Sequence, residues 1–170
     1  MKKLFKVALV ALCLLSIGNF AKAQTKIGYI NFQALISQMP EAKTIKTNID
    51  IYQKTFIDQL TVMNNELQTK GQDFQKNSTA MTDAVRSAKQ SELQDIQKRM
   101  QDYQNDAQQK VDAKTNELSK PLIDRARAAV TEVAKEKGYT YVLDSSQTTL
   151  IVSPESDDML ASVKLKLGLK

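Results

Sequence analysis

Residues 41–120 constrain the fold more than any other part of this chain, because they contain one glycine and no proline. Apolar side chains recur there every three or four residues, which is the spacing of one helical face. A narrow apolar seam of this kind predicts helices that pack against one other helix, as in a coiled coil. The first run is Ile45, Ile49, Tyr52, Phe56, Leu60, Met63 and Leu67; the second is Leu93, Ile96, Met100, Tyr103, Ala107, Val111, Thr115, Leu118 and Leu122.

The seam thins between these runs, where only Phe74, Met81 and Val85 continue it. The segment Lys76-Asn77-Ser78-Thr79 lies in the same region, and Asn and Ser favour helix ends over helix interiors. We therefore expect a turn near residues 77–81 between helices of about 41–76 and 82–120. The result is a long antiparallel helical hairpin, which we call the arm (residues 41–120). The alternative is one continuous helix that dimerises, and the thinned seam argues against it.

The N-terminal residues have the pattern of a secretory signal peptide. Lys2, Lys3 and Lys6 precede an apolar run over 7–17, and Ala21-Lys22-Ala23 forms a small-residue cleavage site. The run is too short to span a membrane. We expect residues 1–23 to be removed and the mature chain, residues 24–170, to be exported. Leu12 stands where a lipoprotein signal needs a small residue, so Cys13 does not predict a lipid anchor.

Charge and composition exclude several classes of function once the leader is removed. The mature chain has 20 basic and 19 acidic residues, and the arm has 12 of each. This balance gives no support for nucleic-acid binding and is typical of a solvated helix surface. The chain has no histidine, and its one cysteine lies in the leader. We find no catalytic group, metal site or cofactor motif, and expect a protein that is not an enzyme.

The flanks of the arm, residues 24–40 and 121–170, predict a small α+β body. Pro40 suits the first turn of the arm helix, and Gly138 suits the end of a helix over 122–137. The other expected elements are a strand in 26–32, a helical turn in 33–38, strands over 139–143 and 148–153, and a final helix to about residue 167. We expect Asp144 to be a turn residue, and Asp157 and Asp158 to lie at the start of that final helix.

A body of 67 residues is too small for a self-sufficient core, and it has no disulfide to stabilise it. We therefore expect it to assemble from several chains. The candidates for body core or subunit contacts are Ile27, Ile30, Tyr141, Leu143 and Ile151. Pro121, at the root of the arm, is a candidate hinge.

The part of the arm seam toward the tip holds the candidate contact residues, Met63, Leu67, Phe74, Met81 and Val85. Packing between the two helices is the simpler explanation for most of them. Two helices alone do not hide a full apolar face, however, and methionine adapts to many partners. Contact with varied unfolded segments is the functional alternative. Lys98, Arg99, Lys110 and Lys114 could face an anionic lipid, but neighbouring aspartates favour a solvated surface.

The order of these parts resembles the Skp/OmpH family of periplasmic chaperones. The resemblance rests on the signal peptide, the strand Ile27–Phe32, the entry Met39-Pro40-Glu41-Ala42-Lys43, the charged hairpin and the segment Gly138–Asp144. It implies a homotrimer whose body holds three helical arms around a cavity, resembling a jellyfish. It also implies ATP-independent binding of unfolded outer-membrane proteins in the periplasm. Because the arm is not strongly basic, we assign no lipopolysaccharide- or membrane-binding residues.

A second hypothesis from the same features is a coiled-coil adaptor of the cell envelope. Such a protein binds one folded partner and does not protect unfolded chains. The sequence names neither that partner nor any individual client.

Overall fold

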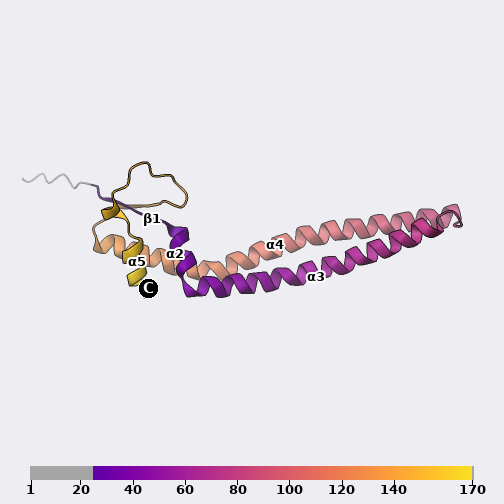
Figure 1. The fold of residues 1–170 in the computed structure, drawn as a ribbon, viewed down its shortest axis with the longest axis horizontal. Coiled ribbons are helices and arrows are strands. Elements are labelled where there is room, and N and C mark those ends of the chain that lie inside the picture. Colours follow the sequence, from indigo (N-terminus) through magenta and orange to yellow (C-terminus); the bar gives the residue numbers. More distant parts are fainter. Residues whose placement is uncertain (1–24, 170) are drawn as a thin grey trace, which may run out of the picture.

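The computed structural model describes residues 25–169, so the expected signal peptide and Cys13 lie outside the described residues. A small body at one end carries two long helices that project from it (Figure 1). These are α3 (Pro40–Asn77) and α4 (Asp83–Glu136). The body also contains β1 (Ile27–Ile30), α2 (Phe32–Gln38), β2 (Tyr141–Asp144), the 3₁₀ helix η2 (Glu155–Asp157) and α5 (Leu160–Lys166). The coarse expectation of long helices with a small sheet is confirmed.

The two long helices lie side by side and join through a turn at residues 78–82 (Figure 1). Pro40 occupies the first turn of α3, where its missing N–H leaves no hydrogen bond unmade. Thr82 caps α4, since its hydroxyl accepts a hydrogen bond from the Val85 N–H at 3.4 Å. One continuous helix over residues 41–120 is therefore not what the chain forms.

Helix α4 continues without a break through Pro121 into the body. The helix expected over 122–137 is thus not a separate element but the last part of α4. Leu122, Ala126 and Val133 are buried on its body-facing side. We attribute the continuity to this packing, which holds the turns that follow the residue that lacks an N–H.

The sheet of the body has two parallel strands, and Ile27 pairs with Tyr141 at one end and Ile30 with Asp144 at the other. The left-handed Gly138, with φ of 71°, ends α4 and directs the chain into β2. Around it, the Gly138 N–H donates to the Lys135 carbonyl and the Tyr139 N–H to the Ala134 carbonyl at 2.9 Å. This pair of bonds is a Schellman motif, which glycine adopts without steric cost.

The core lies where α2, α4 and α5 meet the sheet. Its fully buried side chains include Leu35, Met159 and Val163. Gly28 permits the closest approach in this core, because an added Cβ would lie 2.9 Å from the Met159 sulfur. Met159, the N-cap residue of α5, is therefore packed directly on β1.

The expected strand over 148–153 is wrong. Residues 145–154 form no strand, and two of their apolar side chains are almost fully exposed, Ile151 at 94% and Val152 at 87%. The one extra strand-like contact in the described residues is a bridge between Tyr29 and Asp158 on the other edge of β1. The apolar run at 150–152 predicts a strand, but the single chain supplies no partner for it.

Candidate functional site

The arm is joined by a shallow apolar seam rather than by a buried core. No residue of α3 is buried, and between residues 83 and 120 only Ile96 and Ala107 of α4 are buried. An aromatic contact joins the helices midway, where the rings of Phe56 and Tyr103 have centroids 6.0 Å apart. Tyr52 meets Phe56 edge to face at 5.0 Å. Because only two helices meet, many of the apolar side chains in the seam keep contact with solvent.

The five candidate contact residues of the arm lie on this seam toward its tip. Met63, Leu67, Phe74 and Met81 are half-buried, and Val85 is 46% exposed. These side chains therefore pack between the two helices and also remain partly accessible to solvent. The contact role assigned to them stays a prediction.

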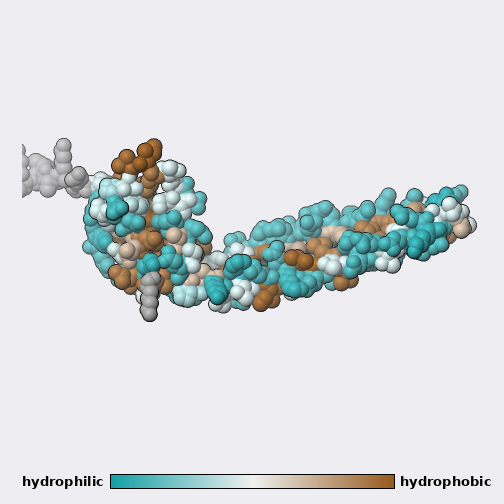
Figure 2. Space-filling model, viewed as in Figure 1, coloured by the Kyte–Doolittle hydropathy of each residue, from teal (hydrophilic) through white to brown (hydrophobic). Residues whose placement is uncertain are grey.

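Three further apolar residues of α3 are more exposed than those candidates, and the seam pattern missed them. Ile51, Ile57 and Val62 are 61%, 52% and 60% exposed. Figure 2 shows apolar patches scattered along a mostly polar arm. The sequence does contain a sign of them, because each is an apolar residue on the otherwise polar face of the helix, away from the seam. We call Ile51, Ile57 and Val62 the outer residues of α3.

Ion pairs connect the two helices at both ends of the seam. Near the tip, Lys70 pairs with Glu92, which raises the pKa of Lys70 and lowers that of Glu92 through their hydrogen bond. At the root, Arg125 donates to Glu41 at 2.6 Å, and this hydrogen bond lowers the pKa of the Glu41 carboxyl. Both pairs are solvent-exposed, so each contributes little to stability on its own.

The turn at the arm tip is closed by one guanidinium. Arg86 donates to the Ser78 carbonyl and to the Met81 carbonyl, each at 3.2 Å, and pairs with Asp83. The first bond satisfies a carbonyl at the C-terminal end of α3, where helical partners are lacking, and the second satisfies a carbonyl within the turn. The tip therefore has a defined conformation although few apolar contacts hold it.

The basic residues on the side of the arm lie among acidic ones. Lys110 pairs with Asp106 at 2.8 Å, and Lys114 pairs with Glu117 at 2.9 Å. Lys98 and Arg99 share a shallow hollow with acidic side chains of the same helix. This mixed charge does not form a basic patch for a lipid headgroup.

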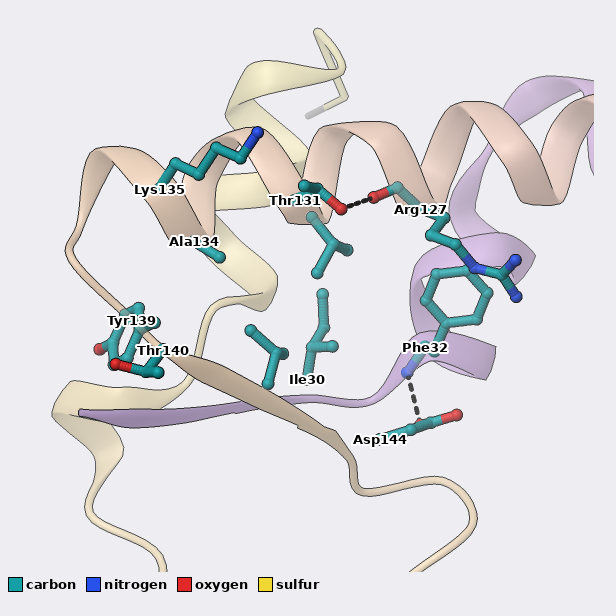
Figure 3. Close-up of a pocket in the computed structure, with 11 residues that line it drawn as sticks. Ile30, Phe32, Arg127, Thr131, Ala134, Lys135, Tyr139, Thr140 and Asp144 are labelled. Atoms are coloured by element: carbon teal, nitrogen blue, oxygen red, sulfur yellow. Dashed lines mark hydrogen bonds between the residues drawn. The ribbon is translucent and has the colours of Figure 1, made fainter. Parts of the chain in front are cut away.

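A cavity of about 480 Å³ lies between α4 and the sheet of the body (Figure 3). Apolar side chains from both elements form its interior, including Ile30, Val130 and Val142, and Arg127 and Lys135 lie at its rim. Asp144 lies at one end and accepts hydrogen bonds from the Phe32 N–H at 3.2 Å and from Ser146. Burial raises the pKa of Asp144, but these bonds outweigh burial, and the pKa is lowered. Asp144 therefore fixes the turn that follows β2.

The body candidates divide into one core residue and four exposed ones. Ile30 is 2% exposed and belongs to the core. A core role within the single chain is wrong for the other four, because Ile27, Tyr141, Leu143 and Ile151 are 48%, 60%, 43% and 94% exposed. Ile27, Tyr141 and Leu143 project from the sheet face opposite the core. Their role as subunit contacts stays a prediction.

The helices formed by residues 25–169 include none with the length and apolarity that crossing a membrane requires. In the same part of the chain, histidine, cysteine and carboxylate side chains form no group of three that could ligate a metal ion.

Comparison with known proteins finds one matching family and several similar chains. Residues 26–167 match the family described as outer membrane protein (OmpH-like). A Yersinia enterocolitica protein named chaperone protein Skp is 27% identical over 96% of this chain and its own full length. Proteins of the same name from Pectobacterium atrosepticum and Photorhabdus laumondii are each 25% identical. They match over 84% and 90% of this chain and over 88% and 92% of their own lengths.

Proposed function

The chain belongs to the OmpH-like family, and on that premise we propose that it is an ATP-independent holdase chaperone of the periplasm. It binds unfolded outer-membrane proteins and prevents their aggregation. We further propose that residues 1–23 direct its export, that it works as a homotrimer, and that the arm is the part that holds clients. No catalytic step and no cofactor enter this function.

The observation that carries the proposal is the distribution of apolar side chains on the arm. The arm presents separate, partly exposed apolar residues on a charged surface, rather than one continuous apolar patch. The residues in question are the outer residues of α3 and the tip-side residues Met63, Leu67, Phe74, Met81 and Val85. Small separated contacts suit clients that share no sequence, whereas one large patch suits a single folded partner.

Many weak contacts are sufficient for holding a client without ATP. When several arms surround one client, each bound segment raises the effective concentration of the others, and overall affinity rises without any strong single contact. Release then needs only that the contacts are lost one by one. An enclosed client also cannot pair its exposed strand edges with another chain, which is the route to aggregation.

The test of this function uses mature protein, residues 24–170, and a urea-unfolded outer-membrane β-barrel protein. The client is diluted into the chaperone without nucleotide, and light scattering and the mass of the soluble complex are measured. We expect scattering to fall and the complex to contain three copies per client. A client that precipitates as fast as in buffer contradicts the proposal and favours the adaptor hypothesis, for which a pull-down of one folded envelope partner is the next experiment.

A shortened arm tests where the client binds. Replacing residues 60–100 by a short Gly-Ser linker removes the outer half of the arm, and the contact between Phe56 and Tyr103 remains to hold the two stumps together. We expect protection of the client to be lost while the number of chains in the assembly stays the same. Unchanged protection would exclude the arm as the client-holding part.

A further inference from the structure

The side of α3 that faces away from the seam has a regular composition of its own. Residues three and four positions apart lie on one face of a helix. One such face is formed by exposed residues only, namely Thr44, Thr47, Ile51, Thr55, Asp58, Val62, Asn65 and Thr69. We call these eight residues the threonine face of α3. We propose that the arm holds an unfolded client on this face, as an extended segment laid along the helix; the inference rests on the holdase function proposed above.

The threonines of this face turn their hydroxyl groups back to the helix. The hydroxyls of Thr47, Thr55 and Thr69 donate to backbone carbonyls of the preceding turn at 3.1, 2.7 and 2.8 Å. A hydroxyl bound in this way leaves the methyl group on the same Cβ free to contact another chain. Because clients of different sequence offer no matched hydrogen-bond partners, a surface whose hydroxyls are already bonded can be covered without leaving one of them unsatisfied.

The threonine face also carries little charge and two large apolar side chains. Asp58 is its one ionised residue, and Lys54 pairs with it at 2.6 Å. Ile51 and Val62 are 61% and 60% exposed, whereas among residues 83–136 of α4 the one large apolar residue that is exposed is Val85, near the tip. In Figure 2, apolar patches lie along the lower edge of the arm, where Figure 1 places α3, and the upper edge is mostly polar. The two helices therefore differ, and α3 is the one that offers apolar contacts.

The length of the threonine face fits one extended segment of a client. From residue 44 to residue 69, a helix rises about 38 Å at 1.5 Å per residue. An extended chain covers that length in about 11 residues, which is about the length of one membrane-spanning β-strand. Such strands alternate apolar and polar side chains. A segment laid along the face can thus turn its apolar side chains to the methyl groups and its polar side chains to water.

A second helix or a folded partner fits this face less well. A stable interface between folded proteins buries about 800 Å² on each side around a packed apolar core. The two large apolar residues, Ile51 and Val62, lie about 16 Å apart along the helix, and Asp58 lies between them. A helix packed along the face would bury the Asp58 carboxylate, which is costly. An extended chain can pass beside that carboxylate and leave it in water.

The first experiment places the photocrosslinking amino acid p-benzoylphenylalanine at single positions of the mature protein. Ile51 and Val62 are the test positions on α3. Gln109 and Gln101 of α4 are the matched controls, because they are exposed, face away from the seam and lie near the same levels of the arm. A urea-unfolded outer-membrane β-barrel protein is diluted into each variant without nucleotide and irradiated. We expect crosslinks to the client from the α3 positions to exceed those from the α4 positions at least fivefold.

The other results separate this inference from the function on which it rests. A client that precipitates with the wild type and with every variant overturns the holdase function. A client that stays soluble but crosslinks equally to both helices, or mainly to α4, overturns the role of the threonine face and leaves the function in place. Crosslinks from the α3 positions to a second copy of the chain that persist when client is added also overturn that role, because the face then joins copies.

The second experiment asks which atoms of the threonines touch the client. T47S/T55S/T69S removes three methyl groups and keeps the hydroxyls, whereas T47V/T55V/T69V keeps the methyl groups and removes the hydroxyls. Serine, threonine and valine have similar helix propensities, so we expect circular dichroism to show unchanged helix content. In titrations of a fluorescently labelled unfolded client, we expect the serine variant to bind about three- to tenfold more weakly and the valine variant at least as tightly as the wild type. A serine variant with wild-type affinity, or a valine variant that loses affinity, would overturn contact through the methyl groups.

Discussion

The body and the arm are built from the same long helix but are stabilised in different ways. In the body, α4 buries Leu122, Ala126 and Val133 against the sheet and the short helices. In the arm, the same helix buries only Ile96 and Ala107, and α3 buries nothing. Burial of apolar surface is the main stabilising term in folding. The body is therefore the rigid part of the chain, and the arm is held by a seam and by exposed ion pairs.

This difference is consistent with the proposed division of roles, in which the body assembles with other copies and the arm binds clients loosely. Subunits need a fixed interface, which a packed core supports. Unfolded clients need accessible apolar groups, and a fully packed arm would have none to offer. The low burial of the arm is thus consistent with the proposed function, and the following predictions test the contrast.

The largest expected effect is in the body core. L35A removes a side chain that is 0% exposed, so we expect it to cost about 2–5 kcal/mol of the free energy of unfolding. I96A is the matched change in the arm, where Ile96 is 1% exposed, and we expect its effect to be confined to local opening of the arm. Urea unfolding measures the first and amide hydrogen exchange the second. An I96A variant that unfolds the body would contradict the division into two regions.

Replacement of Pro121 tests the candidate hinge between the regions. P121A restores a backbone N–H inside a helix, and we expect it to stabilise α4 by about 1–3 kcal/mol. A cavity of about 440 Å³ lies beside this position, between α2 and the roots of α3 and α4, and it gives the root room to move. We expect P121A to narrow the distribution of distances between a spin label at the tip and one in the body. An unchanged distribution excludes Pro121 as the hinge.

One substitution is expected to have opposite signs in the two regions. G28A places a Cβ 2.9 Å from the Met159 sulfur and 3.1 Å from the Tyr139 ring, so we expect a loss of about 1–3 kcal/mol. G71A meets nothing within 4 Å and lies inside α3, so we expect a gain of about 0.5–1 kcal/mol. Thermal unfolding of both variants measures the two changes. If G28A and G71A changed the free energy of unfolding equally, packing would not distinguish the body from the arm.

The smallest expected effect is a pH dependence of the arm. The folded-state pKa values of Glu41 and Glu92 lie below the usual 4.5 because of Arg125 and Lys70, respectively. Their contribution is therefore present above pH 4.5 and is lost as the pH falls through the lowered values. Hydrogen exchange of the arm at pH 6 and pH 3, corrected for intrinsic rates, measures it. E41Q/E92Q should be the less stable form at pH 6 and should show a smaller change between the two pH values.

Local patterns predict the elements whose partners lie within the chain. The spacing of three and four residues in the arm indicates long paired helices, and the fully buried Ile96 belongs to that seam. Gly138 indicates the end of α4, and its positive φ shows why glycine stands there. In each case, the sequence pattern and the local interaction that produces the element lie within the same short segment.

The misses share a different cause, which is that tertiary surroundings decide the outcome. Pro121 predicts a helix boundary, yet packing of the following turns keeps α4 continuous. The segment 148–153 predicts a strand, yet the single chain provides no edge that it pairs with. The outer residues of α3 lie off the seam, so a search for periodic apolar positions does not find them. Apolar periodicity identifies the face of a helix that packs against its partner helix. It does not identify what the outer face contacts.

The parallel pairing of β1 with β2 also sets the order in which the chain can fold. Ile27 meets Tyr141 only after nearly the whole chain has become available, so the body cannot close first. The contacts between α3 and α4 form locally around the tip and can grow toward the root. Once formed, they reduce the loop between the strands from roughly 110 to roughly 30 residues, which lowers its closure cost by about 1 kcal/mol. Formation of the arm therefore lowers the entropic cost of closing the body of the same chain.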